Sequence, residues 1–175
     1  MKKLISMLVL AGLFTTQLSA QKPAEDKSKR PSPPATVTQK IASGATITID
    51  YSQPSIKGRT IGKDIEPMEG KVWRTGANEA TVFETDKAVT VNGAALPAGK
   101  YGFFTIFNGN EVTVIFNKTW KQWGAFDYKM EEDILRVKAK ATEANPSSEK
   151  VTFTISKKGE VNLLWGNKKV SFMVK

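Results

Sequence analysis

The segment YGFFTIFNGNEVTVIF, residues 101–116, decides the fold because it contains two β-strand patterns joined by a turn. An aromatic run from Tyr101 to Phe107 leads into the turn sequence NGN, after which Val112, Val114 and Phe116 occupy alternate positions. Alternation with a period of two places side chains on opposite faces of a strand, and an Asn-Gly step favours a tight hairpin. We therefore predict an antiparallel hairpin with strands near 101–107 and 111–117.

The same alternation continues on both sides of the hairpin. It predicts strands near 45–51, 151–156 and 169–174, and shorter runs near 36–41, 82–91, 135–139 and 161–165 are separated by turn residues, including Gly166-Asn167. Such a series is typical of an all-β fold, either an antiparallel β-sandwich or a partly closed barrel of about eight to ten strands. The aromatic residues expected in the core are Phe103, Phe116, Phe153 and Phe172.

One stretch departs from the strand pattern. Residues 118–133, KTWKQWGAFDYKMEED, predict an irregular aromatic loop with about one helical turn. Two interpretations stay open: the aromatic residues cap one end of the core, or Trp123 and Tyr128 belong to an exposed sugar-binding surface. The acids at the end of this stretch lack the spacing of a calcium loop, so no metal is expected here.

The N-terminus has the three parts of a signal peptide. Lys2 and Lys3 precede an apolar run from Leu4 to Phe14, and Ala20 supplies the small residue before a cleavage point. The run is shorter than the ~20 residues of a membrane-spanning helix, and no cysteine follows it to carry a lipid. We predict that residues 1–20 are removed after Ala20, leaving a periplasmic or secreted protein without a transmembrane anchor.

The rest of the chain is predicted to consist of a linker followed by one domain. Residues 21–34, QKPAEDKSKRPSPP, are rich in proline and charge and predict a disordered linker. Residues 35–175 contain no repeat and no second change in composition. We therefore predict that they form a single β domain, which their length allows.

Composition excludes several kinds of chemistry. The chain has no His and no Cys, so it cannot build a Ser-His-Asp or Cys-His nucleophile or a zinc site of the usual ligands. Its net charge is +9, but the lysines are scattered among acids and form no basic stripe. We expect no nucleic-acid partner and no cofactor; the partners expected are a small molecule or an envelope protein.

Two segments carry candidate binding residues. KVWRTGANEA, residues 71–80, gathers Trp73, Arg74, Asn78 and Glu79 around a glycine, and a turn there would let Arg74 face Glu79. Such a set could bind an anion or a sugar-like ligand, or the arginine and glutamate could be an ion pair that braces the turn. In YSQPSIKGR, residues 51–59, Lys57 and Arg59 follow a strand on a loop that could hold an anion.

Several ordered strings in the chain resemble one known family. They include TITIDYSQPSIKGR, GKVWRTGANEAT, VTVNGAALPAGKYGFFTI and VTVIFNKTWKQWGAFDY, and they cover nearly everything from Ala35 to about Val137. The chain is similar to the DUF2911 family of exported bacterial proteins. This resemblance implies an exported β-rich protein and no established activity.

Three functions are compatible with these patterns. The leading hypothesis is a non-enzymatic exported protein that binds a small anionic or sugar-like ligand, or a partner protein, in a pocket around residues 73–79. A hydrolase or isomerase would instead pair Glu79 with Asp50 or Asp127 as acid and base, because two carboxylates in unlike environments can work without histidine. A structural envelope component would have no pocket.

Overall fold

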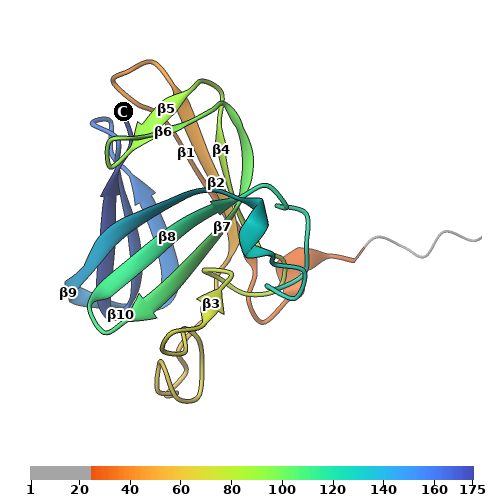
Figure 1. The fold of residues 1–175 in the computed structure, drawn as a ribbon. Coiled ribbons are helices and arrows are strands. Elements are labelled where there is room, and N and C mark those ends of the chain that lie inside the picture. The colour runs from red at the N-terminus through yellow and green to blue at the C-terminus, as the bar shows by residue number, and fades with distance from the viewer. Residues whose placement is uncertain (1–24) are drawn as a thin grey trace, which may run out of the picture.

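The computed structural model describes residues 25–175 (Figure 1). The predicted signal peptide, residues 1–20, lies outside the described residues. The elements, in chain order, are η1 Lys27–Lys29, β1 Pro34–Lys40, β2 Thr46–Ser52, β3 Val72–Trp73, β4 Thr81–Thr85, β5 Val89–Val91, β6 Ala94–Leu96, β7 Gly99–Asn108, β8 Glu111–Asn117, η2 Met130–Glu132, β9 Asp133–Ile155 and β10 Glu160–Met173. The predicted all-β, antiparallel fold is confirmed.

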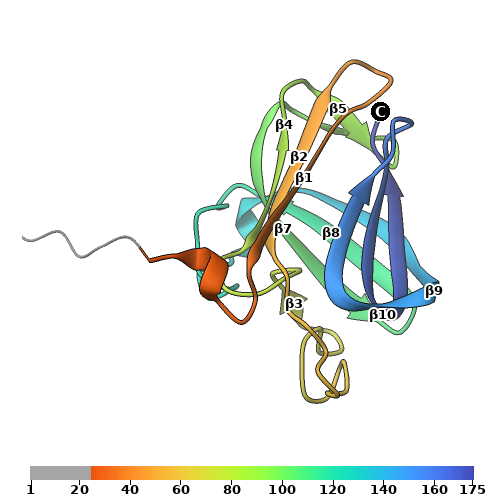
Figure 2. The same ribbon diagram turned by 180° about the vertical axis from the view of Figure 1, so that it is seen from behind.

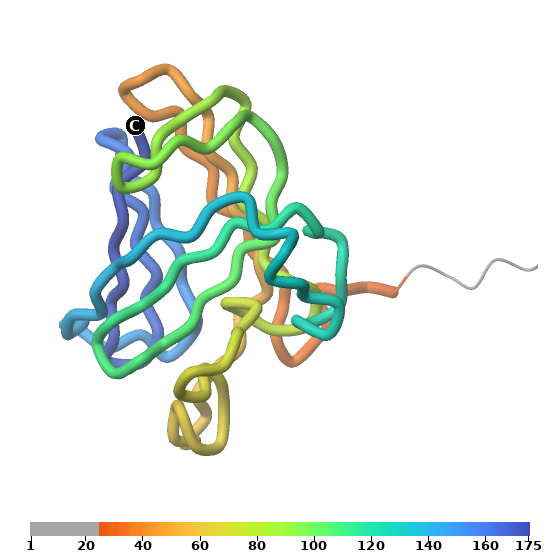
Figure 3. The backbone as a smooth tube through the Cα atoms, viewed as in Figure 1, coloured from red at the N-terminus to blue at the C-terminus, as the bar shows by residue number. Residues whose placement is uncertain are grey.

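Eight strands form one strongly curled sheet in the order β1-β2-β4-β7-β8-β9-β10, and β3 pairs with β7 beside this path. The curl brings the loop after β2 against β9, where the amide of Ile56 donates to Glu149 and the amide of Val151 donates to Pro54. We call this contact the closing seam. The sheet is therefore a partly closed barrel (Figures 1 and 2), and the β5–β6 hairpin lies across one of its ends (Figure 3).

The predicted hairpin is β7–β8, and it carries the centre of the core. Phe103 and Phe116 are opposite each other in the register, and their ring centroids are 5.5 Å apart. The ring of Phe103 also packs on Phe153 and on Phe172, at 5.7 Å and 5.8 Å. All four predicted core aromatics are buried, because the curl turns one face of every long strand inward.

One predicted turn, between the last two predicted strands, is wrong. Gly166-Asn167 does not end a strand but lies within β10, where the pairing with β9 shifts register between Leu164 and Lys168. Gly166 adopts a φ of +59°, which a bulge can use without ending the ladder. The sheet can therefore bend here while both strands continue.

Part of the predicted linker, residues 21–24, lies outside the described residues. In residues 25–33, Asp26 caps η1 by accepting from the amide of Ser28, and β1 begins at Pro34. Arg30 reaches the barrel and pairs with Glu79. Proline-rich composition predicts low helix and sheet content, but it does not reveal ion pairs made to distant residues.

The loop between β8 and η2 is irregular, and η2 is its single helical turn, as predicted. The loop packs on the outer face of β7 and β8, where the ring of Tyr128 lies 5.1 Å from that of Phe104. Trp123 and Phe126 remain exposed, at 53% and 83%. No helix within residues 25–175 is long and apolar enough to cross a membrane.

Candidate functional site

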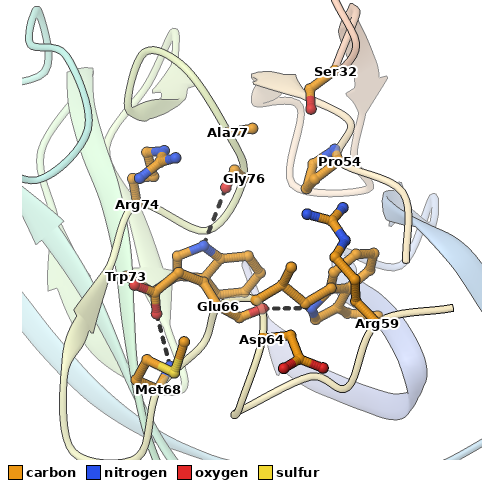
Figure 4. A pocket seen from close by; sticks show the side chains of 12 residues that line it. Ser32, Pro54, Arg59, Asp64, Glu66, Met68, Trp73, Arg74, Gly76 and Ala77 are labelled. Carbon is orange, nitrogen blue, oxygen red and sulfur yellow. Dashed lines mark hydrogen bonds between the residues drawn. The ribbon is translucent and has the colours of Figure 1, made fainter. Parts of the chain in front are cut away.

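One pocket lies beside the closing seam, between the loop after β2 and the turn after β3 (Figure 4). Its volume is about 380 Å³, and we call it the arginine pocket. Twelve residues line it: Ser32, Pro54, Arg59, Asp64, Ile65, Glu66, Met68, Trp73, Arg74, Gly76, Ala77 and Trp165. Two predicted clusters therefore meet in one place.

The turn after β3 is rigid because its own polar groups hold it. Trp73 is buried and its indole nitrogen donates to the carbonyl of Gly76 at 3.1 Å (Figure 4). Thr75 is buried in the left-handed region at φ +53°, and its hydroxyl lies 3.0 Å from that of Thr105. A β-branched residue in this conformation is strained and persists only where its surroundings impose it. The backbone that carries Arg74 is thus fixed in place.

Arg74 lacks the partner that the sequence suggested. Within residues 25–175 its guanidinium makes no ion pair, and its Nε is buried without a hydrogen-bond acceptor. Burial lowers the pKa of Arg74, while the charge of Glu66 opposes that change. A buried N–H without an acceptor costs about 1–3 kcal/mol. The Nε atom of Arg74 is therefore a buried donor without an acceptor among the described residues.

Arg59 lies on the opposite side of the pocket from Arg74 (Figure 4). Its Nε donates to the carbonyl of Ile56 at 3.0 Å, and its Nη2 donates to that of Ser55 at 2.6 Å. These two bonds hold the guanidinium against the loop after β2. The residue itself remains exposed, so it can meet a ligand that enters the pocket.

The two carboxylates of the pocket are occupied by backbone amides. Glu66 accepts from the amide of Met68 at 2.7 Å, and Asp64 accepts from that of Thr60 at 2.8 Å. The carbonyl of Glu66 also accepts from the indole of Trp165 at 2.9 Å (Figure 4). Each carboxylate retains a second oxygen with which it can accept from a ligand.

Glu79 makes its ion pairs with residues other than Arg74. One of its carboxylate oxygens lies 2.7 Å from Lys27, and the other lies 2.8 Å from Arg30. Partial burial opposes ionisation, but the bonds from Lys27, from its own backbone and from Arg30 outweigh burial and lower the pKa of Glu79 to about 2. The predicted Arg74–Glu79 pair does not form.

The other candidate residues are dispersed. The side-chain amide of Asn78 donates to the carbonyl of Ser32 at 2.9 Å and so holds the N-terminal segment. Lys57 is exposed outside the arginine pocket, and its backbone amide donates to Glu149. Tyr128 bonds to Asp133 at 2.7 Å. Burial, followed by that bond, raises its pKa to about 12, against the opposing effect of Arg136.

Of the two carboxylates considered as partners of Glu79, only Asp50 shares a pocket with it. Glu79 and Asp50 both line a small pocket of about 170 Å³, whereas Asp127 does not. Asp50 accepts from the hydroxyl of Thr36 at 2.6 Å. A carboxyl group with a pKa near 2 is ionised at neutral pH and cannot serve as the general acid.

The sequence did not single out Trp165, Asp64 or Glu66 for this site. Trp165 belongs to a strand whose alternation marks it as core, and the two acids lie in a loop without a motif. Only the curl of the sheet brings β10 to the loop after β2. No local pattern could have found that contact.

Fold and pocket together define a partly closed antiparallel β-barrel with a polar pocket beside its closing seam. The family model DUF2911, described as a protein of unknown function, matches residues 32–174, a range that includes all ten strands of the described chain. The chain belongs to this family, as the string WRTGANEAT predicted. Comparisons with curated proteins and with solved structures gave no significant match.

Proposed function

We propose that this protein is an exported, non-enzymatic binding protein whose arginine pocket takes a small anionic, hydroxyl-bearing ligand such as a sugar acid. The observation that carries the proposal is Arg74, whose buried Nε has no acceptor within residues 25–175. A ligand carboxylate would supply that acceptor and would neutralise the guanidinium, for which charge-assisted bonds are strong.

The remaining lining explains why the ligand carries hydroxyl groups as well as a charge. Asp64 and Glu66 are acceptors only, so a ligand beside them has to donate. Trp165 and Ile65 supply apolar surface for the body of the ligand. A pocket with a few fixed polar groups among apolar ones is typical of a small-molecule site.

Thermal unfolding of the mature protein tests this function with D-glucuronate, citrate, inorganic phosphate and uncharged D-glucose as probes. A ligand that binds only the folded state raises the melting temperature in a saturable manner. We expect glucuronate or citrate to do so at millimolar concentration, and glucose to have no effect.

Variants identify the site that responds. Arg74→Gln and Arg59→Gln should each abolish the rise in melting temperature. Lys57→Gln should leave it intact, because Lys57 is on the same loop as Arg59 but does not line the pocket. If no charged probe raises the melting temperature, or if Arg74→Gln still responds, the proposal is wrong.

Export is part of the same proposal and has its own test. The intact mass of the protein recovered from the periplasm or the medium should correspond to a chain that begins at Gln21. Recovery of the chain with residues 1–20 attached to a membrane fraction would contradict it.

A further inference from the structure

A second pocket lies on the aromatic loop, outside the arginine pocket. Its volume is about 280 Å³, its lining is mostly apolar, and we call it the tryptophan pocket. The residues that line it are Glu79, Ala80, Val82, Trp120, Lys121, Gln122 and Trp123. The function proposed above makes no use of it.

Gln122 lines this pocket, and its side chain carries a buried acceptor without a partner. The residue is only 7% exposed, and its Nε2 donates to the carbonyl of Thr119 at 2.7 Å. That bond fixes the orientation of the amide, because a carbonyl can only accept. The Oε1 atom of Gln122 is then left buried with no donor within residues 25–175. A ligand that satisfies it has to bring an O–H or N–H group.

Two indole rings, those of Trp120 and Trp123, line the same pocket, and each has a cation near it. The guanidinium of Arg30 lies 5.6 Å from the ring centroid of Trp123, and the ammonium of Lys100 lies 5.7 Å from that of Trp120. A cation over one face of an indole leaves the other face open. Trp123 and Trp120 are 53% and 38% exposed, so part of each side chain is open to solvent.

We propose that the tryptophan pocket binds a pyranose saccharide. The C–H face of the sugar ring packs against an indole, and a ring hydroxyl donates to Oε1 of Gln122. A purely apolar ligand would leave that oxygen unpaired. A pyranose satisfies both requirements, because it has an apolar face bordered by hydroxyl donors.

The charges around the pocket favour a saccharide that is neutral or acidic. Glu79 is already paired with Lys27 and Arg30, whereas Lys121 makes no ion pair within residues 25–175. A uronate residue in the chain could pair with Lys121. A cationic ligand would be repelled by Lys121, whereas Arg30 and Lys100, which lie near the two rings, are already paired with carboxylates.

Isothermal titration calorimetry of the mature protein tests the proposal with cellohexaose, chitohexaose and a hexamer of galacturonic acid. We expect at least one of the three to bind saturably. Trp123→Ala should weaken that binding by at least about tenfold, as loss of an aromatic anchor does. Gln122→Met, which keeps the side-chain length but removes the acceptor, should weaken it by about three- to tenfold.

Two control variants show whether the saccharide binds in this pocket. Phe126→Ala removes an exposed aromatic ring of the same loop that does not line the pocket, and it should bind like the wild type. Arg74→Gln should also retain saccharide binding, so failure of the arginine pocket would not affect the result. The corresponding monosaccharides should bind more weakly than the hexamers if the natural ligand is a polymer, and equally well if it is a free sugar.

Three results would overturn the proposal. One is the absence of saturable binding by any of the hexamers. Another is an equal loss of binding in Trp123→Ala and Phe126→Ala, which would indicate nonspecific contact with aromatic rings. The third is reversible self-association, measured by analytical ultracentrifugation, that Trp123→Ala abolishes, because the exposed indoles would then be a protein contact.

Discussion

Arg30 and Glu79 form an ion pair across 49 residues of sequence, with 2.8 Å between Nη1 of the arginine and a carboxylate oxygen. The pair attaches the segment before β1 to the turn after β3. Arg30 also bonds to Glu25 and lies over Trp123, so one side chain joins three separate parts of the chain. Glu79 therefore binds the N-terminal segment, whereas Arg74 lines the arginine pocket without forming an ion pair with Glu79.

Double-mutant cycles should distinguish the two arginines. Because Arg30 contacts Glu79 directly, the effects of Arg30→Ala and Glu79→Ala on the free energy of unfolding should be non-additive. The cycle of Arg74→Ala with Glu79→Ala should be additive to within about 0.5 kcal/mol, because no ion pair joins these residues. Urea unfolding of the single and double variants measures the coupling energy in each cycle. Strong coupling between Arg74 and Glu79 would support the ion pair that the sequence suggested.

The stabilisation by Glu79 should depend on pH. Its pKa is lowered from 4.5 to about 2, so the ionised form is favoured in the folded protein. The advantage of the wild type over Glu79→Gln should be complete above about pH 5 and should disappear as the pH falls toward 2. It should amount to a few degrees in melting temperature at most, because the carboxylate is partly exposed. An advantage that persists at the lowest pH would contradict this origin.

Arg74→Met should not destabilise the protein. The substitution removes a partly buried guanidinium whose Nε has no acceptor, and the methionine fills much of the same space. We expect the free energy of unfolding to rise by about 1 kcal/mol. Under the proposed function, the same substitution should also abolish ligand binding. A large loss of stability would show that the arginine is structural.

Gly159 and Gly93 offer a matched pair of turn substitutions. Both adopt a φ of +88°, but a Cβ at Gly159 would overlap the carbonyl oxygen of Val174, whereas a Cβ at Gly93 would meet nothing within 4 Å. Gly93→Ala should cost about 1–2 kcal/mol from backbone strain alone. Gly159→Ala should cost about 1–3 kcal/mol more, because the end of the chain must move. The difference in stability between the two variants, measured by thermal unfolding, gives the cost of the steric overlap at Gly159.

Phe103 should be the most sensitive position of the hairpin. Its ring contacts those of Phe116, Phe153 and Phe172, so Phe103→Ala should lower the free energy of unfolding by about 3–5 kcal/mol. Phe126→Ala, at a ring that is 83% exposed, should change it by less than about 0.5 kcal/mol. Similar effects at the two positions would mean that the core is elsewhere.

The features that sequence predicted correctly are those that depend on near neighbours. Alternation at Val112, Val114 and Phe116 gave the hairpin, because the period of a strand is visible in a short window. The strings around Trp73 and Arg74 indicated the family. These signals require no knowledge of how distant strands pair.

What the sequence did not reveal depends on contacts between distant residues. Nothing near Glu79 indicates that its partner is Arg30, and a glutamate five residues after Arg74 suggested a local pair instead. Gly166 looked like a turn because a bulge uses the same backbone conformation. Trp165 reaches the arginine pocket only because the sheet curls, and curl is a property of all the strands together.

The closing seam also affects the order in which the arginine pocket can form. The arginine pocket takes Ser32 from near the start of the described chain and Trp165 from its last strand. A chain that emerges N-terminus first therefore carries Arg59 and Arg74 long before it carries the strand that completes their pocket. Contacts between such distant residues form slowly in folding. The arginine pocket should thus be complete only after the barrel has closed, so a ligand bound there under the proposed function would indicate closure.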